Sequence, residues 1–202
     1  MKIILGSSSP RRKQILSRLF NDIEIIPPHI DESNLPDEKA DVFTLRMARE
    51  KNLEILNRID RTESGEILII TSDTIVEYRN IILQKPRDRE HAVQILQMLQ
   101  GKTHNVITAI GLTYILNGSV ADTVCSLEKS PVFFKPLSAS GIAAYLDATE
   151  YMDKAGAYAI QENGSMIIEK YEGSHTNIIG FPLRLFFKTA VEIELIKSLF
   201  NL

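Results

Sequence analysis

Apolar and polar residues alternate along the first part of the chain in short runs that predict a strand followed by a helix. Residues 2–6 form an apolar run of strand length. Ser9 and Pro10 then supply a capping residue and a first-turn residue, the residue types with which helices begin. We expect this helix to extend to about Phe20. Its inward face is predicted to consist of Ile15, Leu16 and Leu19.

A short strand, a long helix and a hairpin are predicted next. Residues 22–28 form the strand, and residues 40–59 the helix, because its apolar side chains recur at near-helical spacing. These apolar positions are Val42, Leu45, Ala48, Ile55 and Ile59. A turn at Ser64 and Gly65 precedes the hairpin, which is predicted from two β-rich runs joined at residues 79–80. The two runs are residues 66–78 and 81–86.

The second half of the chain is richer in strands. Strands are predicted at residues 104–116, 119–130, 131–137 and 165–171. Helices are predicted at residues 88–101 and 138–149 and from Pro182 to the C-terminus, with a loop at residues 150–164. Asp88 is the expected cap of the first of these helices, and Gly101 its expected end. This order of elements predicts an α/β or α+β fold with a mixed sheet.

Composition narrows the class of protein. The chain has 202 residues, of which 44% are hydrophobic and 24% charged, and its formal net charge is −3. These values argue against disorder and against a polybasic surface that binds nucleic acid. No apolar run has the length of a membrane helix, and the N-terminal run is too short for a signal peptide. The single cysteine, Cys125, is expected to be a buried small hydrophobe, and we expect a cytoplasmic location.

Arg11 and Arg12 stand side by side where the first strand gives way to the first helix. Free backbone N–H groups and the helix dipole attract anions at that end of a helix, whereas cations there disfavour the helix by up to about 1 kcal/mol. A phosphate group would compensate for this cost. The alternative is that both arginines pair with surface carboxylates or with solvent. The glycine and lysine pattern of a P-loop is absent.

Asp73 interrupts a strand that is otherwise apolar, and burial of a lone carboxylate is costly. The predicted hairpin places it almost opposite Pro86, and therefore places Lys85 within one residue of it across the ladder. One interpretation is a structural ion pair between Asp73 and Lys85. The other is a general base or metal ligand beside a lysine that binds phosphate.

Several further charged residues are ambiguous when taken singly. Asp31 and Glu32 lie in an acidic segment that reads as a solvated loop. Lys51 adjoins the apolar stripe of the long helix, which favours a lysine whose ammonium group reaches solvent. The four histidines lie apart without the spacing of a zinc site. A site in which carboxylates bind a hard cation stays an open alternative.

Seven separated segments together resemble the successive signatures of the Maf nucleoside triphosphate pyrophosphatases. They are ILGSSSPRRKQIL, IDES, AREK, SDTIV, QKPRDREHAVQILQMLQGKTHNVITAI, DKAGAYAIQ and GSHTNIIGFPL. They occur in family order, from the first predicted strand to Leu183. The resemblance implies an α/β fold related to the inosine triphosphate pyrophosphatases, with an elongated mixed sheet, flanking helices and two lobes around a cleft. Residues 1–202 would then form one domain. The sequence leaves the oligomeric state open, and a homodimer is one of the alternatives.

The resemblance also implies roles for particular residues. The side chains that would contact the triphosphate are Ser7, Arg11, Arg12, Lys51 and Lys85. Glu32 and Asp73 would hold a divalent cation, Mg²⁺ or Mn²⁺, and Asp73 would also be the general base. Asp153 and Lys154 would line the opposite wall of the cleft.

Base selection is implied by three positions that distinguish a pyrimidine branch from a 7-methylguanosine branch in families resembling this one. Here they are Arg11, Thr74 and Gln161. The amide of Gln161 carries a donor and an acceptor that match the O4 and N3–H edge of uracil or thymine. We therefore expect dTTP and UTP to be the preferred substrates. Glu162 departs from the family pattern, in which glycine usually follows the glutamine.

Two classes of function are compatible with these residues. The first is an enzyme that hydrolyses a nucleoside triphosphate between the α- and β-phosphates. The second is a nucleotide-binding regulator of cell division or septum formation that senses the nucleotide without turnover. The presence of Asp73 together with Lys51 and Lys85 favours catalysis, because a sensor needs phosphate contacts but no general base.

Overall fold

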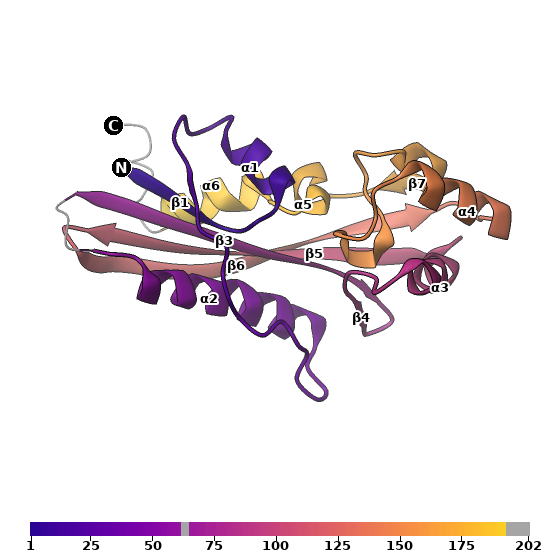
Figure 1. The fold of residues 1–202 in the computed structure, drawn as a ribbon, viewed down its shortest axis with the longest axis horizontal. Coiled ribbons are helices and arrows are strands. Elements are labelled where there is room, and N and C mark those ends of the chain that lie inside the picture. Colours follow the sequence, from indigo (N-terminus) through magenta and orange to yellow (C-terminus); the bar gives the residue numbers. More distant parts are fainter. Residues whose placement is uncertain (62–64, 193–202) are drawn as a thin grey trace.

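The computed structural model describes residues 1–61 and 65–192, which contain a seven-stranded mixed sheet (Figure 1). The strands are β1 (Lys2–Gly6), β2 (Glu24–Ile25), β3 (Glu66–Tyr78), β4 (Ile81–Leu83), β5 (Thr103–Leu116), β6 (Ser119–Phe134) and β7 (Ile168–Tyr171). The helices are α1 (Pro10–Leu16), α2 (Ala40–Arg58), α3 (Arg89–Leu99), α4 (Ala139–Ala148), α5 (His175–Ile179) and α6 (Leu183–Glu192), with single 3₁₀ turns at Ala155–Ala157 and Gly164–Met166. The predicted α/β class with a mixed sheet is confirmed.

Three long antiparallel strands, β3, β5 and β6, run along most of the molecule (Figure 1). The strand order is β2-β1-β3-β5-β6-β7, with β1 parallel to both of its neighbours and β4 paired with β3. The molecule is therefore elongated, and residues far apart along β3 belong to different ends of it.

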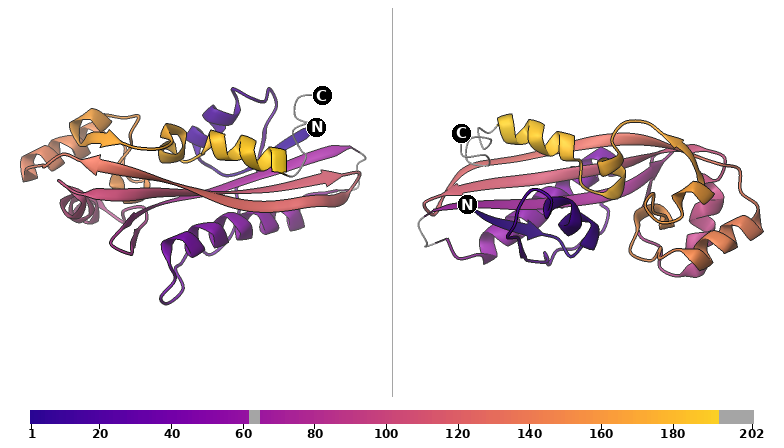
Figure 2. Two further views of the ribbon diagram at one scale, coloured as in Figure 1. Left: turned by 180° about the vertical axis from the view of Figure 1, so that it is seen from behind. Right: turned by 90° about the horizontal axis from the view of Figure 1, so that it is seen from above.

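Helices cover both faces of this sheet. Figure 2 shows α2 on one face and α1, α5 and α6 on the other. Strand β3 serves both faces because its side chains alternate: Ile67 and Ile69 pack in the core beside Ile55 of α2, whereas Leu68 and Ile70 pack with Phe186 of α6. A strand that is covered on both sides explains the nearly continuous apolar run in the sequence.

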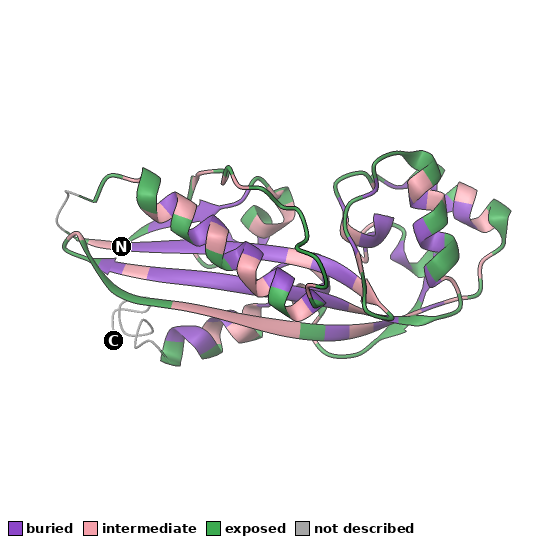
Figure 3. Ribbon diagram, turned by 90° about the horizontal axis from the view of Figure 1, so that it is seen from below, coloured by how far each residue is buried: buried purple, intermediate pink, exposed green. Residues whose placement is uncertain are grey.

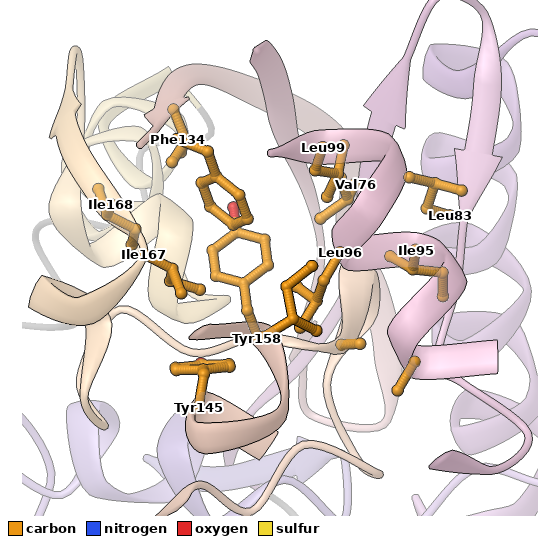
Figure 4. Close-up of a cluster of buried hydrophobic side chains, with 14 of the residues drawn as sticks. Val76, Leu83, Ile95, Leu96, Leu99, Phe134, Tyr145, Tyr158, Ile167 and Ile168 are labelled. Atoms are coloured by element: carbon orange, nitrogen blue, oxygen red, sulfur yellow. The ribbon is translucent and has the colours of Figure 1, made fainter. Parts of the chain in front are cut away.

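A separate hydrophobic core lies at the end of the sheet that carries α3, α4 and β7 (Figure 4). The rings of Phe134 and Tyr158 pack edge to face at its centre, with 4.8 Å between their centroids. Helix α3 contributes the apolar face that the sequence predicts, which consists of Ala92, Ile95, Leu96 and Leu99. Its predicted cap is confirmed, because Asp88 accepts a hydrogen bond from the His91 N–H group.

The buried face of α2 differs from the predicted stripe (Figure 3). Ala48 and Ile55 are buried as expected, but Val42 is 55% exposed and Phe43 and Met47 are buried in its place. The apolar spacing could not fix the rotation of this helix, because its buried face also includes polar residues such as Thr44.

Other boundaries were predicted wrongly. Helix α1 ends at Leu16, so Leu19 is 38% exposed and does not face inward. Strand β6 continues through Pro131 as one strand where two were expected, and β4 ends at Leu83. Cys125 is only partly buried. Strand β2 is confined to Glu24–Ile25, and the first residues of the predicted strand 165–171 form part of a 3₁₀ turn.

Two expectations reach beyond the described residues. Ser64 of the predicted turn lies outside them, and so does the part of the C-terminal helix that was expected after Glu192. Within residues 1–61 and 65–192, no helix combines the length and the apolar character needed to cross a membrane.

Candidate active site

A cavity of about 510 Å³ opens beside the middle of β3. Its lining includes all the residues that the sequence analysis singled out as site residues: Ser7, Arg11, Arg12, Glu32, Lys51, Asp73, Thr74, Lys85, Asp153, Lys154 and Gln161. They come from the β1–α1 connection, α1, the loop before α2, α2 itself, β3, the segment after β4 and the segment after α4. Segments that are distant in sequence thus meet at one place.

The cavity lies where β3 changes its pairing partner. On the edge of β3 that faces away from β5, β1 pairs with β3 only as far as Thr71, and β4 begins to pair with it at Val76. Among the described strands, none pairs with residues 72–75 of β3 on this edge. Because side chains alternate along a strand, Asp73 points toward Lys51 of α2 and Thr74 toward Arg12 of α1 at the same opening.

The Asp73 carboxylate forms a buried ion pair with Lys51, at 2.6 Å between Oδ1 and Nζ. The Lys51 ammonium also contacts Oε1 of Glu32 at 2.8 Å. The Lys51 side chain is only 6% exposed, so the interpretation of a solvent-reaching lysine was wrong. A buried charge requires a partner, and here two carboxylates share one ammonium group.

Lys85 does not form the ion pair with Asp73 that the hairpin register predicted. The β3–β4 ladder ends at Leu83, and Asp73 lies opposite Ala109 of β5 instead. Lys85 is exposed at the cavity, where its ammonium makes no hydrogen bond or ion pair with any described residue. Its charge is therefore available to a ligand.

The charge of Glu32 is stabilised by the surrounding cations. Partial burial alone would raise its pKa, but the ammonium of Lys51, with smaller contributions from Lys85 and Arg12, holds the pKa of Glu32 below its ordinary value. Glu32 is thus ionised near neutral pH. It lies at the exposed end of the Lys51 contact, with half of its side chain in solvent.

Arg12 is turned inward and held by three hydrogen bonds. Its Nε donates to the Gly180 carbonyl at 3.0 Å, Nη1 to Ser7 Oγ at 3.1 Å and Nη2 to Thr74 Oγ1 at 3.0 Å. Burial lowers the pKa of Arg12, an effect that Asp73 opposes and Arg11 reinforces. The sequence analysis gave pairing with a surface carboxylate or with solvent as the alternative for this residue. Arg12 is bound to neutral oxygen atoms of the protein instead.

The opposite wall of the cavity is joined to Arg11 by alternating charges. Arg11 Nη1 contacts Asp153 Oδ2 at 2.9 Å, and Lys154 Nζ contacts Asp153 Oδ1 at 2.9 Å. Lys154, which is 5% exposed, also contacts Glu162 at 3.4 Å and the Glu150 carbonyl. Partial burial alone would raise the pKa of Asp153, but Lys154 and Arg11 lower it. For Arg11, pairing with a carboxylate is confirmed, and that carboxylate lies at the cavity.

The two remaining predicted residues differ in their surroundings. Gln161 is exposed at the cavity, and its side chain makes no hydrogen bond with the described residues. The Thr74 hydroxyl is engaged, because Oγ1 accepts from Arg12 and lies 3.1 Å from Thr108 Oγ1. A role of Thr74 in base selection stays a prediction.

Sequence reasoning assigned no role to Gly180 or to Thr108. The Gly180 carbonyl accepts hydrogen bonds from Arg12 and from Ser72 Oγ. Its φ of +114° favours glycine, and an added Cβ would lie 3.2 Å from Thr74 Oγ1, a tight contact that would push against the hydroxyl group. A glycine after a short apolar segment is a recognisable helix end. The partners of the Gly180 carbonyl, in contrast, depend on contacts between segments that are distant in sequence, so local pattern could not predict them.

The sequence is similar to those of several named proteins over nearly its whole length. A dTTP/UTP pyrophosphatase of Acetivibrio thermocellus is 38% identical, covering 91% of this chain and 90% of that protein. Proteins of the same name from Neisseria meningitidis serogroup A and Aquifex aeolicus are 40% and 36% identical and cover 90% and 100% of this chain, and 89% and 100% of their own lengths.

Likeness to solved structures is much weaker. A nucleoside-triphosphatase / dITP/XTP pyrophosphatase of Mycobacterium abscessus gives a TM-score of 0.39 at 15% identity, covering 68% of this chain and 76% of that one. The model of the Maf-like protein family, in contrast, matches residues 2–193, and with relatives of 36–40% identity over nearly the whole length this chain belongs to the Maf-like protein family.

Proposed function

We propose that this chain is a nucleoside triphosphate pyrophosphatase that cleaves dTTP and UTP to the nucleoside monophosphate and pyrophosphate. The observation that carries this proposal is the charge of the cavity. Five basic and three acidic side chains line it, whereas the whole chain has a formal net charge of −3. A local excess of positive charge in a concave site favours a polyanionic substrate. The names of the relatives support the same reaction.

The phosphate groups would be held by basic residues with unused capacity. A guanidinium has five N–H groups, and Arg12 uses three of them within the protein, which leaves two for a phosphate. Lys85 keeps its whole ammonium group for the ligand. Arg11 would exchange Asp153 for a phosphate oxygen, and Ser7 would lie next to the same group.

Asp73 would act as the general base. It would take a proton from a water molecule that attacks the α-phosphorus, and the bond between this phosphorus and the bridging oxygen would break as pyrophosphate leaves. Lys51 supports this role because its ammonium holds the Asp73 carboxylate in a buried ion pair. In this proposal Lys51 serves the base first and the phosphate second.

Glu32 and Asp73 would hold a divalent cation, Mg²⁺ or Mn²⁺. No three carboxylate, imidazole or thiol groups of the described residues gather into a complete metal site. The two carboxylates nevertheless fit Mg²⁺, which keeps several waters and is usually held by one or two carboxylates together with substrate phosphates. When bound, the ion would neutralise charge on the phosphates. Lys51 would then give up part of its contact with the two carboxylates.

The base would be selected by Gln161. Its free side-chain amide can offer an acceptor to N3–H and a donor to O4 of thymine or uracil. Cytosine reverses these two positions, and a site built on such hydrogen bonds rejects the mismatched base because polar groups are left unpaired. We therefore expect CTP to be a poor substrate.

We also infer how the chain is organised around this site. Residues 1–202 would form one domain with two lobes, since one hydrophobic core lies under α3 and α4 and the others lie on the two faces of the sheet at α1, α2 and α6. The single cysteine supports a cytoplasmic location.

A panel of nucleotides tests the reaction and the base preference together. We expect pyrophosphate and no orthophosphate from dTTP and UTP, with lower kcat/KM for CTP, dATP and 7-methyl-GTP. Orthophosphate as the product contradicts the cleavage position. Tight nucleotide binding without turnover supports the regulator instead, and 7-methyl-GTP as the best substrate contradicts the pyrimidine assignment.

The role of Asp73 is tested by Asp73→Asn, which keeps the shape of the side chain but removes the base. We expect kcat to fall roughly 10²-fold to 10⁴-fold while nucleotide binding persists. Asp147→Asn is the matched control, because Asp147 is exposed and pairs with Arg89 away from the cavity. Near-normal turnover by Asp73→Asn, with chemistry rate-limiting, would exclude Asp73 as the base.

A further inference from the structure

A chain of hydroxyl groups lies beneath the cavity and ends on Arg12. Arg12 Nη2 donates to Thr74 Oγ1 at 3.0 Å, and Thr74 Oγ1 lies 3.1 Å from Thr108 Oγ1. Thr108 Oγ1 in turn donates to the main-chain carbonyl of Asn177 at 2.9 Å. Thr74 and Thr108 lie directly opposite each other on β3 and β5, which explains why their hydroxyl groups meet.

The direction of each hydrogen bond in this chain follows from the number of protons. A hydroxyl group has one proton, and that of Thr108 is committed to the Asn177 carbonyl. The hydroxyl proton of Thr74 must therefore point toward Thr108. The Thr74 oxygen is then left as an acceptor for Arg12.

The end of this hydrogen-bonded series at Asn177 is held firmly in the fold. Asn177 is fully buried, and its side-chain amide donates to the Val106 carbonyl at 3.1 Å and to Ser130 Oγ at 2.9 Å. Helix α5, which carries Asn177, is therefore bound to both β5 and β6. The same short helix leads into Gly180, whose carbonyl holds Nε of Arg12.

We propose that Thr108, which does not line the cavity, is a positioning residue that sets the orientation of Arg12 through Thr74. Without the Thr108 hydroxyl, the proton of Thr74 loses its partner and can rotate toward the Arg12 guanidinium, where it opposes the hydrogen bond from Nη2. A long flexible side chain that is held in place loses less entropy when a ligand binds. This inference rests on the proposed function only in taking Arg12 as a phosphate ligand.

The test is Thr108→Val, which keeps the shape of the side chain and removes the hydroxyl. The probe is inorganic tripolyphosphate, titrated calorimetrically into the full chain without nucleotide. We expect its Kd to rise about 3-fold to 10-fold, the range of one lost hydrogen bond, and Thr108→Ser to restore it. In turnover of dTTP, KM should rise by a similar factor with little change in kcat.

Thr113→Val is the matched control. Thr113 lies on the same strand, is equally buried, and bonds to Asn52 and Thr123 instead of to the site. It should lower thermal stability about as much as Thr108→Val and leave the Kd for tripolyphosphate unchanged. An equal loss of binding in both variants overturns the positioning role.

A double-mutant cycle tests whether Thr108 acts through Arg12. In an Arg12→Ala background, Thr108→Val should change the Kd for tripolyphosphate less than 2-fold. A full effect of Thr108→Val in that background overturns the proposal, and so does normal tripolyphosphate binding by Arg12→Ala. If Thr108→Val does not fold, Thr108→Ala against Thr108→Ser provides the same comparison. Because the probe is not a nucleotide, a chain that binds tripolyphosphate but does not hydrolyse dTTP contradicts only the proposed function.

Discussion

At the scale of single residues, the basic side chains of the site fall into two groups. Lys51 and Lys154 are each about 5% exposed and are satisfied by carboxylates of the protein. Lys85 makes no hydrogen bond or ion pair with the described residues and is exposed at the cavity. Arg12 belongs to both groups, because it is tied to three protein oxygens and still keeps two N–H groups.

This division predicts that Lys85→Ala and Arg12→Ala both weaken substrate binding but differ in their effect on stability. Lys85→Ala should leave the free energy of unfolding within about 0.5 kcal/mol, as expected for a surface group without partners, and raise KM for dTTP. Arg12→Ala should also raise KM, but it should cost about 1 to 3 kcal/mol of stability because Ser7, Thr74 and Gly180 each lose one hydrogen-bond donor. Urea unfolding of the two variants, together with their kinetics, provides the comparison.

Lys13→Ala is a suitable control for both variants, since Lys13 is an exposed basic residue of α1 that does not line the cavity. It should change neither stability nor KM appreciably. Equal stabilities of the Arg12 and Lys85 variants would mean that the three hydrogen bonds of Arg12 contribute nothing to the folded state.

At the scale of secondary structure elements, local pattern predicted what depends on local chemistry. The cap at Asp88, the apolar face of α3 and the break between β5 and β6 all follow from neighbouring residues. The rotation of α2 and the end of β4 did not follow, because they depend on partners elsewhere in the fold. For the same reason the sequence identified Asp73 as unusual but assigned its ion pair to Lys85 instead of Lys51.

Strand β5 carries one further buried group, His104, into the core at the α3 end of the sheet. Its Nε2 lies 2.7 Å from the Tyr158 hydroxyl, and burial lowers the pKa of His104 to about 3. The unfolded chain takes up a proton near the ordinary histidine pKa of about 6.5, whereas the folded protein does not. The contribution of neutral His104 to folding stability is therefore complete above pH 6.5 and is lost progressively as the pH falls below that value.

We expect the free energy of unfolding to fall by about 2 to 3 kcal/mol between pH 6.5 and 4.5 because of His104. His104→Gln should be less stable at pH 7 but should remove most of this slope, whereas His175→Gln, at an exposed position, should retain it. Carboxyl groups with lowered pKa, such as Glu32 and Asp153, lose their contributions at lower pH. Urea titrations at several pH values give the slopes, and an unchanged slope in His104→Gln contradicts the assignment.

At the scale of the whole molecule, the site is assembled from segments that no local pattern connects. The long strands β3 and β5 run along most of the sheet (Figure 1). The cavity opens beside β3, between the two ends of the sheet. Arg11 of α1 and Asp153 of the opposite wall meet across it at 2.9 Å. This contact places a carboxylate where, in the proposed function, Arg11 would meet a phosphate. Asp153 thus competes with the ligand for Arg11 while it links the two walls.

This competition predicts an unusual result for Asp153→Asn. Loss of the carboxylate frees Arg11 and makes the cavity more positive, so tripolyphosphate should bind about 2-fold to 10-fold more tightly, as expected for one partly exposed charge pair. The wall that carries Gln161 also loses its tie to α1, so the preference for dTTP over CTP should decrease. Asp147→Asn changes the net charge equally and should alter neither property, because Asp147 pairs with Arg89 outside the cavity. Calorimetry with tripolyphosphate and kcat/KM for the two nucleotides measure both effects. Weaker tripolyphosphate binding by Asp153→Asn would show that Asp153 supports the anion site instead of competing with it.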